Sequence, residues 1–150
     1  MTIQKQAGTA AETAFVRYAL ANGFLTARRE TLFGSGDRGD VRLAESVIVE
    51  LKHRRTTTGN AALGQPGAKE LAGWMAETER ERINAGATYA ALVVKRAGTT
   101  DVGQWWCYIP MWQLAHLWGF HPDLSNGRSQ SPICMTVDSW FDLLKAAGLQ

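Results

Sequence analysis

Residues 40–53 read DVRLAESVIVELKH. The segments DVRLA and SVIVELKH are both typical of β-strands, and a short turn near Glu45 joins them, so we expect a β-hairpin. Side chains alternate between the two faces of a strand. Glu50 and Lys52 therefore share one face of the second strand, and Val49 faces the other way with the apolar residues that anchor the strand.

Asp40 opens the first strand of this hairpin. Its side chain lies on the same face as Glu50 only if the two strands pair in a register such as residue 40 opposite residue 50, in which the paired residue numbers have an even sum. A shift of one residue would place the Asp40 side chain on the other face of the sheet. That register requires an odd-length turn or a β-bulge near residues 44–46. The two carboxylates would then stand about 5 Å apart at Cβ, close enough to bind one cation.

Two carboxylates at this separation repel each other unless a proton or a cation lies between them. Hard oxygen ligands with open water positions suit Mg²⁺ or Mn²⁺. Such an ion lowers the pKa of bound water and neutralises charge on a phosphodiester, and Lys52 could orient the water or stabilise the developing negative charge. The alternative is an ion-pair network on a solvated sheet face.

The rest of the chain predicts an α/β fold in the order α-β-β-β-α-β with additions, which means a mixed sheet flanked by helices. The apolar run of residues 88–96 indicates a central strand that is buried on both faces. The other expected elements are a helix from Thr9 to Gly23, a strand over 24–33, a helix from Ala68 to Ala85, a strand over 104–110, a helix over 111–118, a strand over 133–137, and a helix from Asp138, its N-cap, to Gly148.

The composition is that of an ordinary globular chain: 150 residues, 45% hydrophobic and 20% charged. We expect one domain over residues 1–150, in the cytoplasm, because there is neither an apolar run of membrane-spanning length nor a signal-peptide pattern. The spacing of Cys107 and Cys134 indicates neither a disulfide framework nor a zinc site, and we expect both thiols to be buried. The net charge of +2 is too small to identify a nucleic-acid binder.

Five features occur here in this order: a helix with a glutamate, a strand, a Gly-rich loop, GDV at the start of a strand, and VIVELK at the end of a hairpin. Together they resemble the PD-(D/E)xK nuclease superfamily, and within it the Holliday junction resolvase-like branch of phages and archaea. The resemblance covers about residues 8–96 and implies a restriction-endonuclease-like core.

The resemblance implies that Asp40 and Glu50 bind the divalent metal, Mg²⁺ or Mn²⁺, with the Leu51 carbonyl as a further ligand, and that Lys52 is the catalytic lysine. Asp37 competes with Asp40, which we favour because a strand begins directly after it.

Glu12 has two interpretations. It matches the N-terminal glutamate that completes the catalytic set in resolvases, and it also completes a capping box with Thr9. The sequence leaves both open.

DNA contacts are expected from residues that flank the proposed site. Ser35 resembles the serine of a mobile loop near the scissile bond, and the arginines suit phosphate contacts, although a solvated charged face is the alternative. The predicted contacts are Arg28, Arg29, Ser35, Arg38, Arg54 and Arg55. Trp105 and Trp106 must face opposite sides of their strand; we expect both to pack, and stacking of one on an unpaired base is the alternative.

The resemblance thus implies a metal-dependent DNA endonuclease, first of all a Holliday junction resolvase that acts in recombination or repair without a membrane or a small-molecule cofactor. A resolvase nicks two strands symmetrically, so a homodimer is expected. The apolar segments MWQLAHLWGF and SWFDLL offer a dimer surface. The alternatives are another structure-selective, nicking-repair or restriction-type nuclease and a catalytically silent DNA-binding module.

Overall fold

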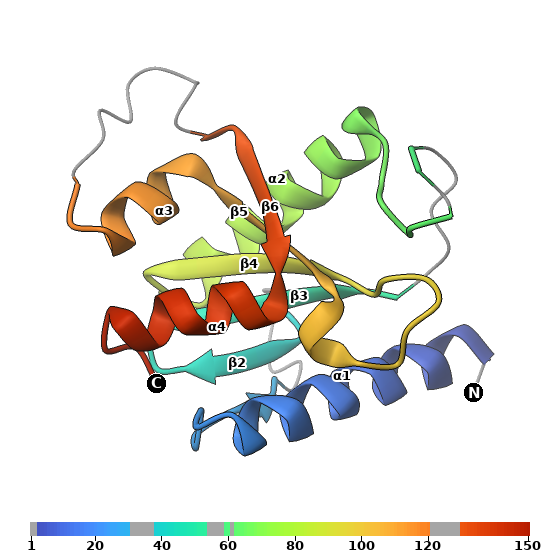
Figure 1. The fold of residues 1–150 in the computed structure, drawn as a ribbon, viewed down its shortest axis with the longest axis horizontal. Helices are drawn as coiled ribbons and strands as arrows, with labels where there is room; N and C mark the ends of the chain where they lie inside the picture. The colour runs from blue at the N-terminus through green and yellow to red at the C-terminus, as the bar shows by residue number, and fades with distance from the viewer. Residues whose placement is uncertain (1–2, 31–37, 54–58, 61, 121–129) are drawn as a thin grey trace.

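The structure is a computed structural model that describes residues 3–30, 38–53, 59–60, 62–120 and 130–150. In these residues four α-helices surround one six-stranded mixed sheet (Figure 1). The helices are α1 (Ile3–Ala21), α2 (Ala68–Asn84), α3 (Met111–Leu117) and α4 (Val137–Ala146). The strands are β1 (Arg28–Arg29), β2 (Val41–Ala44), β3 (Val47–Lys52), β4 (Tyr89–Val94), β5 (Trp106–Pro110) and β6 (Pro132–Thr136).

The strands lie side by side in chain order from β1 to β6. β3 and β4 are parallel, with α2 as the connecting helix, and every other neighbouring pair is antiparallel. The predicted α/β class and the order α-β-β-β-α-β are therefore confirmed. β4 is buried along its whole length, as its apolar run predicts.

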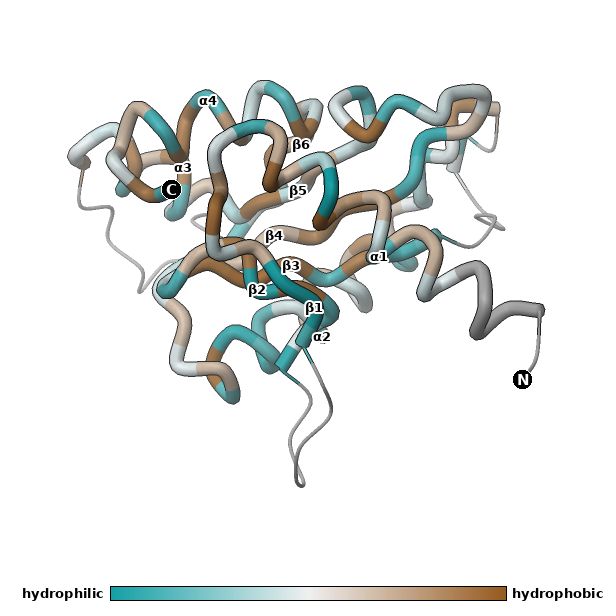
Figure 2. Tube along the Cα trace, turned by 90° about the horizontal axis from the view of Figure 1, so that it is seen from below, coloured by the Kyte–Doolittle hydropathy of each residue, from teal (hydrophilic) through white to brown (hydrophobic). Residues whose placement is uncertain are grey.

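Helices cover the sheet on both faces. On one face α1 and α4 pack against the strands through a core that includes Phe15, Val49 and Phe141. On the other face Trp74 of α2 packs against Leu92. Figure 2 shows α2 on the opposite side of the strands from α4. Glu50 and Lys52 thus point toward the α2 face, because their neighbours in β3 fill the core on the α1 face.

The β2–β3 hairpin has the register that the sequence predicts. Val41 pairs with Val49 and Arg42 pairs with Ile48, so the paired numbers add up to 90. A bulge lies between Arg42 and Ala44, close to the predicted position. The Asp40 backbone N–H donates to the Val49 carbonyl at 3.0 Å, which extends the hairpin to Asp40.

The predicted capping box at Thr9 is wrong. α1 begins at Ile3, and the Thr9 carbonyl accepts a hydrogen bond from Thr13 Oγ1 inside the helix at 2.8 Å. The residues ahead of Thr9 include Gln, Lys and Ala, which favour helix and extend it toward the N-terminus. Glu12 is therefore an interior helix residue, and the interpretation of Glu12 as a cap partner falls away.

Two further expectations are corrected. The first strand is confined to Arg28–Arg29 within the predicted 24–33, of which 31–33 lie outside the described residues, and Phe24 instead packs on Phe141 with ring centroids 4.4 Å apart. Cys107 is buried as expected, but Cys134 is exposed because β6 ends the described sheet. In the described part of the chain, no helix combines the length and the apolarity needed to cross a membrane.

The N-cap of α4 is Thr136 and not Asp138. Thr136 Oγ1 accepts a hydrogen bond from the Ser139 backbone N–H at 3.3 Å, whereas Asp138 accepts one from the Tyr18 hydroxyl. Burial, together with this contact to Asp138, raises the pKa of Tyr18 to about 12.

Replacement of this cap should destabilise the protein. We expect Thr136→Ala to lower the free energy of unfolding by about 1 kcal/mol, because the first turn of α4 loses its side-chain acceptor. Thr136→Ser keeps the hydroxyl and should cost little. Urea unfolding of the two variants beside wild type measures the difference; equal stabilities of Thr136→Ala and Thr136→Ser would contradict this capping role.

Candidate metal and phosphodiester site

Asp40 and Glu50 lie together on the α2 face of the sheet, as the hairpin register requires. Glu50 is 6% exposed. Asp40 is half-buried, and its Oδ2 accepts a hydrogen bond from the Leu51 backbone N–H at 2.8 Å. This contact fixes the Asp40 carboxylate at the edge of β3, beside the strand that carries Glu50.

Lys52 lies between two carboxylates. Its Nζ is 2.7 Å from Glu50 Oε1 and 2.8 Å from Glu77 Oε2. Burial alone would lower the pKa of Lys52, but these two carboxylates outweigh it and raise the pKa. Lys52 is therefore a fixed positive charge directly beside Glu50.

The helix α2 contributes two acids that the sequence analysis did not identify. Glu77 and Glu81 approach Glu50, so that one carboxylate oxygen of each residue lies within 4.8 Å of the others. Glu81 is 2% exposed. The sequence contains a signal for Glu81. Trp74, Thr78 and Glu81 follow helical spacing, four and three residues apart, and they form the buried stripe of α2.

Burial and crowding of like charges shift the acid pKa values upward. Burial, and next the Glu50 charge, raise the pKa of Asp40 to about 7, although the hydrogen bond from Leu51 acts in the opposite direction. Burial and the Glu81 charge raise the pKa of Glu50 to about 8, against the opposing effect of Lys52. Asp40 and Glu50 thus hold protons near neutral pH that a bound cation would displace.

The donor set fits a hard divalent cation. Among the described residues, the ligand atoms of Glu50, Glu77 and Glu81 lie close to one another, and Asp40 adjoins this group through Glu50; all four offer carboxylate oxygens. The Leu51 N–H faces Asp40, and the carbonyl of a strand residue points to the same side as its N–H, so the Leu51 carbonyl also faces this edge. The ligand role that the resemblance implies for this carbonyl stays a prediction.

Glu12 of α1 lies close enough for its charge to contribute to the raised pKa of Asp40. Its Oε2 accepts a hydrogen bond from Arg29 Nε at 2.6 Å, and an Arg29 terminal nitrogen lies 2.5 Å from the same oxygen. Glu12 thus links a predicted DNA-contacting arginine to the margin of the site.

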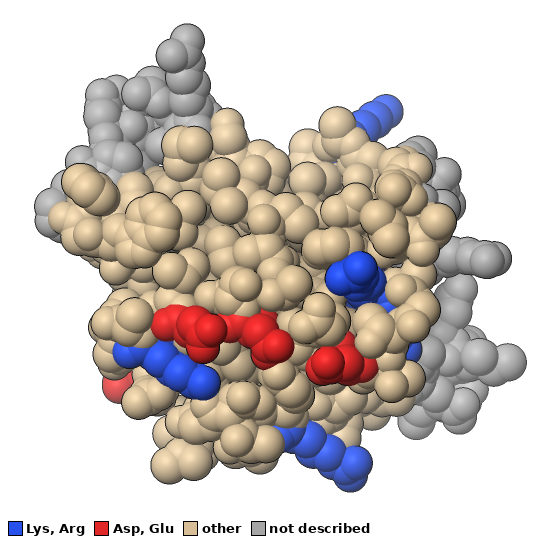
Figure 3. All heavy atoms as spheres, viewed as in Figure 1, with Lys and Arg blue, Asp and Glu red and all other residues tan. Residues whose placement is uncertain are grey.

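The other predicted DNA contacts divide into two groups. Arg28 and Arg38 are exposed, and Arg28 pairs with Arg42 across β1 and β2. Ser35, Arg54 and Arg55 lie outside the described residues, as does the competing Asp37. Figure 3 shows the α1 and α4 face, where the coloured Lys and Arg side chains are few and separate and a band of acidic side chains crosses the surface. Among the described residues of that face, the positive side chains do not form a continuous surface.

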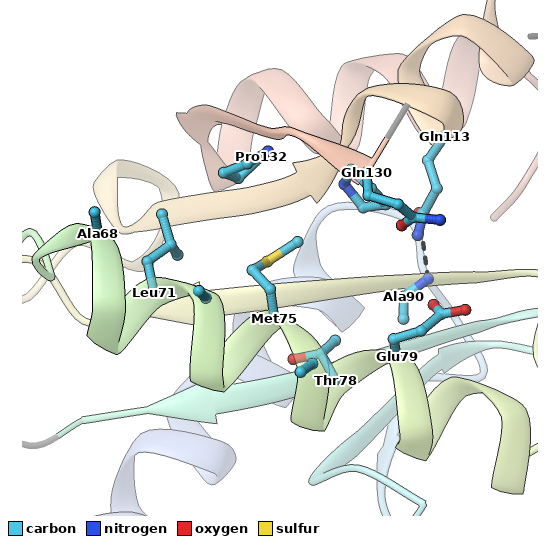
Figure 4. A pocket seen from close by; sticks show the side chains of 12 residues that line it. Ala68, Leu71, Met75, Thr78, Glu79, Ala90, Gln113, Gln130 and Pro132 are labelled. Carbon is cyan, nitrogen blue, oxygen red and sulfur yellow. Dashed lines mark hydrogen bonds between the residues drawn. The ribbon is translucent and has the colours of Figure 1, made fainter. Parts of the chain in front are cut away.

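A separate cavity of about 490 Å³ lies between α2, β4, α3 and the start of β6. Figure 4 shows Leu71 and Met75 of α2 facing Pro132, and the Gln113 amide oxygen accepting a hydrogen bond from the Ala90 N–H at 3.3 Å. This lining is mainly apolar and includes neither Glu77 nor Glu81. The cavity is therefore distinct from the acidic cluster and unsuited to a phosphodiester.

The candidate site combines residues from the β2–β3 hairpin with two acids of α2 and with Glu12 of α1 at its margin. Its geometry provides buried and half-buried oxygen donors and one fixed ammonium group, which is chemistry suited to a metal ion and an anionic substrate. Comparison with protein-family models, with curated proteins and with solved structures finds no match for this chain.

Proposed function

We propose that this protein is a metal-dependent DNA endonuclease of the PD-(D/E)xK kind that hydrolyses phosphodiester bonds with Mg²⁺ or Mn²⁺. The observation that carries the proposal is the hairpin register, which places Asp40 beside Glu50 and sets Lys52 one alternation further on the same face. The order α-β-β-β-α-β, with β4 parallel to β3, supports the restriction-endonuclease-like core.

Asp40, Glu50 and the Leu51 carbonyl would hold the ion, with Glu77 and Glu81 near enough to hold ligated water or to share the ligand set. When bound, the metal supplies a water of lowered pKa and neutralises charge on the phosphodiester. Lys52 is held in place by Glu50 and Glu77, and its remaining N–H would donate a hydrogen bond to the attacking water or to a phosphate oxygen. Glu12 orients Arg29 beside the substrate.

Within this activity we propose a Holliday junction resolvase that acts as a symmetric dimer, since two opposed nicks require two sites. The end of α3 offers an apolar surface for such a dimer: Trp118 is 63% exposed and Phe120 is 66% exposed. Both belong to the segment that the sequence analysis assigns to a dimer surface.

The test is cleavage of a synthetic four-way junction and of a linear duplex with the same arm sequences. Purified protein is incubated with each DNA in Mg²⁺, in Mn²⁺ or in chelator, and the strands are separated on a denaturing gel. We expect paired symmetric nicks in the junction, none in the duplex, and none in chelator.

The outcomes separate the candidate functions. Equal cleavage of junction and duplex would overturn the resolvase proposal. The nuclease proposal would remain, with a broader or different DNA substrate. Binding without cleavage under every metal condition would overturn the enzyme and leave a silent DNA-binding module. Cleavage that persists in chelator would overturn the metal requirement.

A further inference from the structure

Arg96 lies just beyond β4 on the face of the sheet that carries the acidic cluster. Lys52 pairs with Val94 in the parallel β3–β4 ladder, and Val94 pairs with Trp106 of β5. The Arg96 guanidinium carbon lies 4.5 Å from the centroid of the Trp106 ring. Arg96 is therefore the next side chain after Val94 on the site's face, one strand away from Lys52.

The platform under Arg96 is fixed in place. Trp106 Nε1 donates a hydrogen bond to the Leu63 carbonyl at 2.8 Å, which ties the chain ahead of α2 to β5. Gly64 has φ +72, and a Cβ there would lie 3.0 Å from the Ala97 nitrogen and 3.1 Å from the Lys95 carbonyl oxygen. The Gly64 backbone thus packs closely against the backbone around Arg96, while the Arg96 guanidinium lies over the indole ring.

Arg96 differs from Lys52 and Arg29 in having no carboxylate partner among the described residues. Lys52 is paired with Glu50 and Glu77, and Arg29 with Glu12. In the part of the chain that the structure describes, Arg96 forms no ion pair with a carboxylate, and the contact found for its guanidinium is the Trp106 ring. A guanidinium stacked on an aromatic ring keeps its N–H edge available for an anion.

We propose that Arg96, stacked on Trp106, binds a phosphate of the DNA strand next to the phosphodiester that is cleaved; this inference rests on the proposed function. Adjacent strands are about 4.8 Å apart and two residues along a strand span about 6.6 Å, so Arg96 can reach a phosphate close to the one at Lys52. Its planar fork suits two parallel hydrogen bonds to phosphate oxygens. Arg96 is thus a positioning residue for the substrate backbone.

The chain supplies a matched control in the neighbouring residue. Lys95 carries the same charge, but its Nζ lies 5.9 Å from the centroid of the Trp105 ring, in the core cluster of the opposite face. Lys95→Ala and Arg96→Ala therefore change the net charge equally and differ in the face from which the charge is removed.

The experiment measures binding of a labelled four-way junction in chelator over a series of NaCl concentrations. We expect Arg96→Ala to weaken binding about tenfold and to reduce the slope of log K against log salt by about 0.9, as for one lost phosphate contact. Lys95→Ala should weaken binding about twofold or less, and Arg96→Lys should fall between, because it keeps the charge and loses the fork. Thermal unfolding curves verify that each variant is folded.

The outcomes distinguish this inference from the proposed function. Equal effects of Arg96→Ala and Lys95→Ala, or no junction binding by wild type at low salt, would overturn the phosphate site. If wild type cuts DNA but Arg96→Ala binds like Lys95→Ala, the nuclease stands and the Arg96 site fails. If wild type never cuts but Arg96→Ala alone weakens binding, the phosphate contact of Arg96 stands, while the nuclease and the place of Arg96 beside a cleaved phosphodiester both fail.

Discussion

Glu50→Gln should abolish DNA cleavage while the protein remains folded and bound to DNA. The amide is nearly the same size as the carboxylate and still accepts a hydrogen bond from Lys52, but it lacks the charge that a divalent cation requires. We expect the single-turnover rate of junction cleavage in Mg²⁺ to fall by about a thousandfold or more, because the ion and its transition-state stabilisation are lost together. Junction binding in chelator should change by about twofold or less.

Glu45→Gln is the matched control for this prediction. Glu45 is exposed in the turn of the same hairpin, and its backbone carbonyl accepts the hydrogen bond from Arg42 Nη1, so the substitution changes no contact at the site. Its cleavage rate should stay within about twofold of wild type. Unchanged cleavage by Glu50→Gln would rule out Glu50 as a metal ligand and, with it, the proposed site.

Asp40→Asn should stabilise the metal-free protein at neutral and alkaline pH. The pKa of Asp40 is about 7 in the folded protein against an ordinary value of 3.8, so between these values the folded state keeps a proton that the unfolded chain has lost. Wild-type stability therefore falls as pH rises, by up to roughly 1.4 kcal/mol per pH unit for this group, and the loss ends above about pH 7. Asparagine does not titrate, and its amide oxygen can still accept the Leu51 hydrogen bond.

The measurement is urea unfolding of wild type and Asp40→Asn in chelator between pH 4.5 and 8.5. The advantage of the variant should be smallest at pH 4.5, grow to on the order of 3 kcal/mol near pH 7, and level off only once Glu50, whose pKa is about 8, has also lost its proton. Asp142→Asn, at an exposed position on α4, should show no such growth. Addition of Mg²⁺ should stabilise wild type at pH 8 more than Asp40→Asn. A pH-independent difference would contradict the raised pKa of Asp40.

The sequence predicts the hairpin and its register because two local rules agree there. Apolar side chains must lie on the core face of β3, and strand alternation then places Glu50 and Lys52 on the other face. The central position of β4 follows in the same way from its uninterrupted apolar run. The ends of α1 and α4 were less predictable, because several polar residues near each end could serve as the cap.

Glu77 and Glu81 were missed because their approach to Glu50 depends on how α2 packs in the fold. On α2 alone, both residues are good helix formers in a strongly charged segment and suggest solvent exposure. Their position against Glu50 is set by the crossing of α2 over β3, which brings together residues more than 25 positions apart. Helix periodicity gives the face of a helix, but the strand beneath that face comes from tertiary packing.

The hairpin register, with its bulge between Arg42 and Ala44, determines both the position of the acidic pair and the packing of the core. Deletion or insertion of one residue in the hairpin loop could shift the register so that Asp40 no longer faces Glu50. The same shift would move Val41 and Leu43, which are both fully buried, out of the core. A change in the length of this loop would therefore disrupt the acidic pair and the core packing together. Loss of the acidic pair with the fold retained would come through substitution, and inactive descendants should keep this turn length.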